Sequence, residues 1–370
     1  MRIKNFLIMF FTLCTFFVMS SVFADENNVL PSQTGLVQSV QYVDMNNDAA
    51  QTKQVVQVKI LTGEFKGENI DLENVLTGNP YYDIKLKKGV KVILHAEDNG
   101  DGVEYSIEDI KRSGSLVWLS MIFCILLIYV GRKKGIYSLV SIVLTILLIT
   151  HILSPLILLG VNPIIATILI CILSTAVTMY LVGGFNAKST SAAIGAVLSL
   201  LFASLLSSIV MVTAHLTGYA DENSMFLYSA HPELNFVALT VSMMVLATLG
   251  AVMDVAMSIA STINEIYLTD NTKRVKDLFV SGMNVGRDII GTMANTLILV
   301  YMGGSLTLVL LSGNIDLLKF INLNQVVTEV ASALIGSIAI VICVPFTALV
   351  ASLLIHSYAK KAETEKLPWN

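Results

Sequence analysis

The fold class is decided by residues 236–263, which read FVALTVSMMVLATLGAVMDVAMSIASTI. Asp254 is the only charged side chain in this stretch. An α-helix rises about 1.5 Å per residue, so roughly 20 consecutive apolar residues cross the hydrocarbon core of a bilayer. We therefore expect residues 236–263 to form a transmembrane helix with a carboxyl group deep in the membrane.

Apolar segments of similar length lie on both sides of this stretch. They cover residues 116–130, 136–158, 164–182, 191–216, 289–311 and 326–358. The chain is 55% hydrophobic and 14% charged, whereas about 25% of the residues of a soluble domain are charged. The sequence predicts a membrane α-helical bundle of seven spans over residues 116–358, followed by a cytoplasmic tail at 359–370.

The first 24 residues have the pattern of an export signal. Arg2 and Lys4 precede an apolar run at residues 6–19, and Val22-Phe23-Ala24 supplies a small residue at a plausible cleavage position. Extended to Phe23, the run would just reach the roughly 17 residues needed to span a bilayer. Residues 1–24 are thus a cleaved signal peptide or a retained signal anchor, and a retained anchor would bring the number of spans to eight.

Residues 25–115 differ sharply in composition from the rest. They contain 9 Lys and Arg and 15 Asp and Glu, and apolar residues alternate with polar ones at 35–42, 54–61 and 90–96. The turn sequence Asn99-Gly100-Asp101-Gly102 separates the last of these segments from residues 103–107, as in a β-hairpin. We expect a small all-β domain, a barrel or a sandwich, on the extracytoplasmic side.

The same turn can also be compared with a calcium loop. Glu97, Asn99, Asp101, Gly102 and Glu108 occupy positions one, three, five, six and twelve of an EF-hand. The first position is Glu rather than Asp, and strands rather than helices flank the turn. Turn chemistry therefore explains these residues, and we expect no metal site here.

The basic residues of the short loops indicate the orientation of the bundle. If residues 25–115 are outside, eleven Lys and Arg lie on the cytoplasmic side, and only Lys319 lies in a short outer connection. Basic residues are retained in the cytoplasm, so this bias agrees with the export signal. The eleven are Arg132, Lys133, Lys134, Lys188, Lys273, Arg274, Lys276, Arg287, Lys360, Lys361 and Lys366.

Several classes of function are disfavoured. The net charge of −4 and the lack of a basic stripe argue against nucleic-acid binding. Cys14, Cys124, Cys171 and Cys343 all lie in apolar stretches, so they form neither a disulfide framework nor a metal knuckle. There is no Walker A motif, so any ATP coupling would come from another polypeptide. We expect no cofactor.

Two polar helix faces are candidates for a functional site. Gly250, Asp254, Ser258 and Thr262 recur at a spacing of four in the fifth span. A charge at the centre of a membrane helix costs about 2.5 kcal/mol or more, which makes Asp254 a functional candidate, although a structural carboxylate is the alternative.

The sixth span carries the second polar face, formed by Asp288, Thr292 and Asn295. Counted from the cytoplasmic ends of their spans, Asp254 and Asn295 lie at similar depths of roughly 16 and 12 Å. We therefore predict one polar cluster between the fifth and sixth spans, with a cytoplasmic mouth. The cluster comprises Asp254, Ser258, Thr292 and Asn295, and the mouth comprises Glu265, Arg287 and Asp288.

Two further segments favour helix packing and surface contact. Ser191, Gly195, Ser199, Ala203 and Ser207 place small side chains on one face of the fourth span, which predicts close packing against another helix. Residues 273–279 alternate basic and apolar side chains, as in a short amphipathic helix at the cytoplasmic interface; a solvated charged loop is the alternative.

The two motifs GAVMDVAMSIA (residues 250–260) and GRDIIGTMANT (residues 286–296) resemble the YibE/F-like family of bacterial multipass membrane proteins. The resemblance covers nearly the whole chain and implies an N-terminal hydrophobic segment, an extracytoplasmic β-rich domain and a multispan bundle in the bacterial cell membrane. It implies no particular reaction.

Three functions are compatible with these patterns. The first is a permease or transport component for a small solute or ion. The second is a membrane anchor that presents the β domain to an envelope protein, and the chain could also form homo-oligomers. The third, an intramembrane aspartyl protease using Asp254 and Asp288, is disfavoured because the two residues differ in depth by about 16 Å, whereas a carboxylate dyad shares one proton at contact distance. We therefore expect a non-enzymatic protein in contact with the lipid bilayer.

Overall fold

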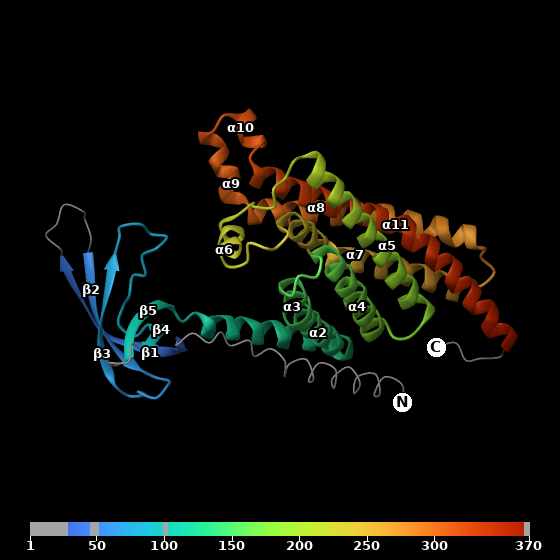
Figure 1. Cartoon of the computed structure of the whole chain (residues 1–370). Coiled ribbons are helices and arrows are strands. Elements are labelled where there is room, and N and C mark those ends of the chain that lie inside the picture. The colour runs from blue at the N-terminus through green and yellow to red at the C-terminus, as the bar shows by residue number, and fades with distance from the viewer. Residues whose placement is uncertain (1–28, 45–51, 99–102, 366–370) are drawn as a thin grey trace. The chain divides into compact units, whose positions relative to one another are not determined.

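The computed structural model describes residues 29–44, 52–98 and 103–365. These residues form two compact units that divide between Leu126 and Leu127 (Figure 1). The predicted signal at residues 1–24 lies outside the described residues, as do residues 366–370 of the predicted tail.

The N-terminal unit is a five-stranded antiparallel sheet resembling a small barrel, which confirms the predicted all-β fold. Its strands are β1 (Val29–Asp44), β2 (Thr52–Ile60), β3 (Asn69–Leu76), β4 (Lys91–Asp98) and β5 (Val103–Ile110). The strand order is β3-β2-β1-β4-β5. The long β1 pairs with β4 through its first half and with β2 through its second half.

The core of this unit follows from the period-two pattern of the strands. Alternate side chains of a strand point to opposite faces, so Val56, Val58 and Ile60 of β2 all point inward. They pack with Val37, Leu86, Val92 and Leu94. The strand β3 was not among the strands expected from the sequence.

β4 and β5 form the predicted hairpin, in which Glu97 lies opposite Glu104. The turn residues 99–102, and with them Asn99, Asp101 and Gly102 of the calcium alternative, lie outside the described residues. The flanking elements are strands, whereas an EF-hand requires two helices.

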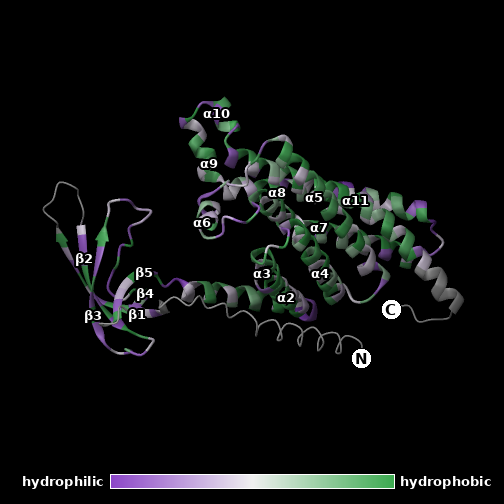
Figure 2. Ribbon diagram, in the orientation of Figure 1, coloured by the Kyte–Doolittle hydropathy of each residue, from purple (hydrophilic) through white to green (hydrophobic). Residues whose placement is uncertain are grey.

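The second unit is helical, and its ribbons are predominantly hydrophobic (Figure 2). The helix α2 (Ser113–Leu148) crosses the division between the units, and its residues from Leu127 onward belong to the helical unit. The other elements of this unit are the π-helical turn η1 (Ile149–Leu153), α3 (Ser154–Leu158), α4 (Pro163–Gly183), α5 (Ala187–Thr213), α6 (Glu222–Ala230), α7 (Phe236–Thr269), α8 (Val275–Gly304), α9 (Leu306–Leu311), the 3₁₀ turn η2 (Ser312–Asn314), α10 (Leu317–Ile321) and α11 (Asn324–Glu365).

Among the described residues, five helices are long and apolar enough to cross a membrane, or six if α8 and the segment after it count as one bent span. The bend between Val275–Gly304 and Leu306–Asn314 measures 67° and follows the pair Gly303-Gly304. The predicted segments 116–130 and 136–158 both fall within the single helical stretch Ser113–Leu158.

This stretch is not straight. Arg132 has φ 49° and ψ −129°, which is not helical. A Cβ atom on Gly135 would lie 2.1 Å from the carbonyl oxygen of Leu127, although residues eight apart in a straight helix are separated by about 12 Å along the axis. The chain therefore reverses direction sharply at Arg132, and α2 consists of two helical segments.

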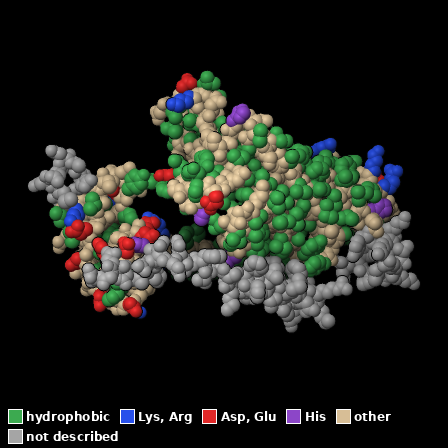
Figure 3. All heavy atoms as spheres, viewed as in Figure 1, with side chains coloured by type: hydrophobic (Ala, Val, Ile, Leu, Met, Phe, Trp, Pro, Cys, Tyr) green, Lys and Arg blue, Asp and Glu red, His purple; other side chains and the backbone are tan. Residues whose placement is uncertain are grey.

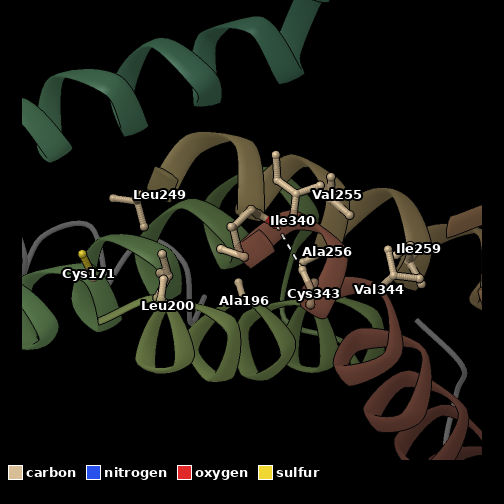
Figure 4. Packing of buried hydrophobic residues seen from close by; sticks show 14 of the residues in the cluster. Cys171, Ala196, Leu200, Leu249, Val255, Ala256, Ile259, Ile340, Cys343 and Val344 are labelled. Atoms are coloured by element: carbon tan, nitrogen blue, oxygen red, sulfur yellow. Dashed lines mark hydrogen bonds between the residues drawn. The ribbon is translucent and has the colours of Figure 1, made fainter. Parts of the chain in front are cut away.

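The core of the helical unit lies where α5, α7 and α11 meet (Figure 4). Small side chains such as Ala196, Ala256 and Cys343 line this contact and allow the helices to approach closely. The predicted small-residue face of α5 is buried along its whole length and packs there: Ser191, Gly195, Ser199, Ala203 and Ser207.

The outer surface of the helical unit is also largely hydrophobic on the face that Figure 3 displays. For example, Leu169 of α4 is 59% exposed and Leu205 of α5 is 61% exposed. Apolar area of this extent is costly in water and favourable against lipid tails. The unit is thus suited to contact with a lipid bilayer.

Candidate functional site

Asp254 projects from the side of α7 that does not enter the core. Val252, Val255, Ala256 and Ile259 of α7 are fully buried, because their spacing places them on the faces that pack against neighbouring helices. Asp254 lies outside these buried positions and is accessible. In the part of the chain that the structure describes, its carboxylate has no hydrogen bond or ion pair.

Asp254 lines a partly open cavity of ≈ 560 Å³ that is bounded by α2, α4 and α7. We call this space the Asp254 cavity. Its polar lining comes from Ser138, Ser141 and Thr145 of α2 and from Thr178 of α4. Most of the remaining lining is isoleucine, leucine and methionine side chains.

Two hydroxyl pairs join α2 to α4 along this cavity. Ser141 Oγ lies 2.6 Å from Thr178 Oγ1, and Thr145 Oγ1 lies 2.9 Å from Ser174 Oγ. The pairs are one helical turn apart on antiparallel segments, so they form a short polar ladder. Such interhelical hydrogen bonds satisfy hydroxyl groups that would otherwise face hydrocarbon.

The helix α2 is followed by a π-helical turn at the edge of the Asp254 cavity. The π-helical turn η1 begins at Ile149, which lines the Asp254 cavity. Thr150 Oγ1 donates to the carbonyl oxygen of Ile146 at 2.9 Å within the same region. Single π-turns inside α-helices often occur at functional sites.

The other residues of the predicted cluster do not line this cavity. Thr292 and Asn295 lie at exposed positions of α8, and Thr292 Oγ1 donates to the carbonyl oxygen of Ile289 at 3.0 Å. Ser258 is exposed on α7 one turn beyond Asp254. The structure thus brings Asp254 together with hydroxyl groups of α2 and α4 rather than with Thr292 and Asn295.

The orientation of α8 explains this arrangement. Two glycines of α8 face its neighbours: an added Cβ would lie 2.6 Å from Ile263 Cδ1 at Gly282 and 2.1 Å from Val344 Cγ1 at Gly286. Because these glycines pack against α7 and α11, Asn295 lies on the opposite side of the helix.

The residues of the predicted cytoplasmic mouth are all exposed. Glu265, Arg287 and Asp288 make no ion pair with one another within the described residues, and the guanidinium of Arg287 donates to Asn284 Oδ1 at 3.1 Å. Asp288 is not among the residues that line the Asp254 cavity.

The predicted amphipathic segment 273–279 is the loop end and first turns of α8 rather than a separate helix. Its apolar Leu278 is fully buried. In the preceding loop, hydrogen bonds from the hydroxyl and backbone N–H of Thr272 hold the pKa of Asp270 below its usual range, and Lys273 at 3.7 Å acts in the same direction.

The predicted cluster did not include the hydroxyl residues of α2 and α4, although the sequence contains a signal for them. Ser138, Ser141 and Thr145 recur at spacings of three and four in one apolar segment, and Ser174 and Thr178 recur at four in the next. Each set shares a helix face. Within the described ranges, no three His, Cys, Asp or Glu side chains gather where they could hold a metal ion.

Comparison with known protein families gives two matches. Residues 119–357 match the model of the YibE/F-like protein, and residues 32–110 match that of the YibE/F family N-terminal domain. Neither the curated proteins nor the solved structures gave a match. The two matched regions together cover most of the chain, which therefore belongs to the YibE/F family.

Proposed function

We propose that this protein is a component of a membrane transport system that moves a small solute or ion through the helical unit. The observation that carries the proposal is that Asp254, an ionisable residue, lines a ≈ 560 Å³ cavity in a set of membrane-length helices. Ionisable side chains within membrane spans are costly, and they commonly serve substrate or ion pathways.

The proposed arrangement in the membrane has seven spans after the export signal. The stretch Ser113–Leu158 has 46 residues and would extend about 69 Å as one helix, more than twice the thickness of the hydrocarbon core. The reversal at Arg132 favours two spans with a basic turn on the cytoplasmic side. Residues 25–115 are then extracytoplasmic, and the C-terminus is cytoplasmic in the bacterial cell membrane.

The first test of this proposal compares the wild type with Asp254→Asn. The substitution keeps the size of the side chain and removes its charge, so we expect normal protein levels and loss of transport. Metabolite and ion levels of a deletion strain, complemented with either form, would identify a candidate solute. Its flux into proteoliposomes would then be measured.

The matched control is Asp270→Asn, which makes the same change in the loop after α7, outside the cavity. We expect it to preserve flux. Full flux with Asp254→Asn in a correctly inserted protein would refute the role of the carboxylate.

One observation favours a second function, that of an anchored binding module. Tyr81 and Tyr82, in the loop after β3, are 73% and 65% exposed, and their rings contact edge to face. Exposed aromatic residues are common where proteins bind partners. If residues 25–115 restore function in a deletion strain when they are fused to an unrelated anchor, the binding function is correct and the transport proposal is refuted.

A further inference from the structure

We infer that the Asp254 cavity accepts an amphipathic organic cation, in which an ammonium group is attached to an apolar body. This inference rests on the proposed transport function and names the chemical class of the substrate. It comes from the charge, the hydrogen bonding and the apolar walls of the cavity.

The charge of the lining favours a cation. Among the described residues that line the cavity, Asp254 is the only ionisable one, and none is Lys, Arg or His. A carboxylate in an apolar environment is stabilised by a positive partner, and an isolated one is costly. An anion would meet repulsion from Asp254 with no compensating group.

The hydroxyl groups argue against a bare inorganic cation. Hard cations require about six oxygen ligands that converge on one point. Ser141 and Thr178 bond to each other at 2.6 Å, and Thr145 bonds to Ser174 at 2.9 Å. These hydroxyl groups already bond to each other across the α2–α4 contact, so an inorganic cation that recruited them would have to compete with those bonds.

The walls of the cavity fit an apolar body. Met179, Met253 and Met257 line it together with Ile142 and Leu249. Methionine side chains are flexible and polarizable, so they adapt to apolar groups of different shape. The volume of ≈ 560 Å³ lies within the range of about 300–1,000 Å³ that is usual for pockets that bind small organic molecules.

The inference can be tested with three probes that share one apolar body. These are 4-phenylbutylammonium, 4-phenylbutanol and 4-phenylbutyrate, which carry a positive, a neutral and a negative head. Binding of each tritiated probe to the full chain in lipid nanodiscs is measured by scintillation proximity, and empty nanodiscs give the background from partition into lipid. Binding of ²²Na⁺ is measured in the same way.

We expect the ammonium probe to bind most tightly. Asp254→Asn should weaken it at least about tenfold, without weakening the alcohol. Asp254→Glu, which keeps the charge, and the control Asp270→Asn should bind the ammonium probe within about threefold of the wild type. Equal binding of all three probes would overturn the inference, because the cavity would then accept apolar molecules such as lipid tails. Binding of ²²Na⁺ that depends on Asp254, without binding of the ammonium probe, would overturn it as well.

The failure of this inference and the failure of the proposed function give different results. If flux of ²²Na⁺ or protons into proteoliposomes depends on Asp254 while the ammonium probe does not bind, transport stands and the substrate class is wrong. If the ammonium probe binds through Asp254 but no flux is measured for any of these ions or probes, the cavity is a binding site and transport is wrong.

Discussion

Single residues decide how closely two helices of the bundle approach each other. A Cβ atom added at Gly195 of α5 would lie 2.2 Å from Thr347 Oγ1 and 2.8 Å from Thr347 Cα in α11. The second of these atoms belongs to the backbone, so a rotamer change cannot relieve the clash. At Gly291 of α8, by contrast, an added Cβ meets nothing within 4 Å.

We expect Gly195→Ala to destabilise the helical unit by about 1–3 kcal/mol, the usual cost of overpacking. Gly291→Ala is the matched control, and it should be neutral or stabilising because alanine favours the helix. Thermal unfolding of the two purified variants in the same detergent provides the measurement. Equal melting temperatures would show that α5 and α11 can separate without cost.

A second prediction at the residue scale concerns Asp83 in the β unit. Its carboxylate accepts hydrogen bonds from the backbone N–H of Thr77 at 2.6 Å and of Gly78 at 2.9 Å, and from Thr77 Oγ1 at 2.9 Å. Desolvation alone would raise the pKa of Asp83, but these hydrogen bonds together lower the pKa below its usual value. The ionised form of Asp83 therefore stabilises the folded unit.

Because the pKa of Asp83 is lower in the folded state, its stabilisation is present above the unfolded pKa of about 3.9 and is lost as the pH falls through the folded value. Asp83→Asn should therefore lower the melting temperature of residues 25–115 at pH 7, and the difference from wild type should shrink toward pH 3. Circular dichroism measures the melting temperatures of the wild type and the variant across this pH range. Asp71→Asn, an exposed change on β3, is the control; a difference that is constant with pH would contradict the prediction.

At the scale of elements, the hydroxyl ladder holds α2 against α4. Replacing Ser141 or Thr178 by alanine removes one partner of a 2.6 Å contact. Interhelical hydrogen bonds in membranes contribute about 0.6–2 kcal/mol. We expect a coupling energy of that size from the single and double variants, measured by unfolding in mixed micelles. Strictly additive effects would mean that the two hydroxyl groups do not interact in solution.

The strands and helices could largely be predicted from the sequence, because each depends on a local pattern. Period-two alternation predicted β2 and the β4–β5 hairpin, and long apolar runs predicted α4, α5, α7 and α11. The strand β3 was missed because its inward positions are Ile70, Leu72, Asn74 and Leu76, and the polar Asn74 interrupts the apolar alternation. The amide of Asn74 instead donates hydrogen bonds to Gln54 Oε1 and to the carbonyl oxygen of Ile84.

The partners of Asp254 could not be predicted in the same way. Counting residues along a helix gives depth, but it does not tell which way the helix is rotated about its axis. That rotation depends on tertiary packing, and here Gly282 and Gly286 turn one side of α8 toward α7 and α11. Thr292 and Asn295 consequently point elsewhere, although counting residues along the helices predicts depths similar to that of Asp254.

At the scale of the whole molecule, the orientation in the membrane is the prediction with the clearest test. An alkaline-phosphatase fusion after Ser115 should be active, because this enzyme folds only outside the cytoplasm, and a fusion after Asn370 should be inactive. The basis is the bias of eleven basic residues to one in the short loops. A third fusion after Lys134 should also be inactive, which tests whether Ser113–Leu158 crosses twice. The opposite pattern of reporter activities would mean that the bundle has the reverse orientation in the membrane.

The three walls of the Asp254 cavity are held very differently. α7 has buried positions along its whole length, from Phe236 to Tyr267, whereas the buried positions of α2 are only Gly135, Ser141, Leu144 and Leu148. Separating α2 from α4 would break two hydroxyl contacts at a cost of about 1–3 kcal/mol, whereas moving α7 would disrupt the core. Of the three walls, α2 is therefore the one that can move at least cost, and its displacement would widen the cavity without disturbing the packing of α7 in the core.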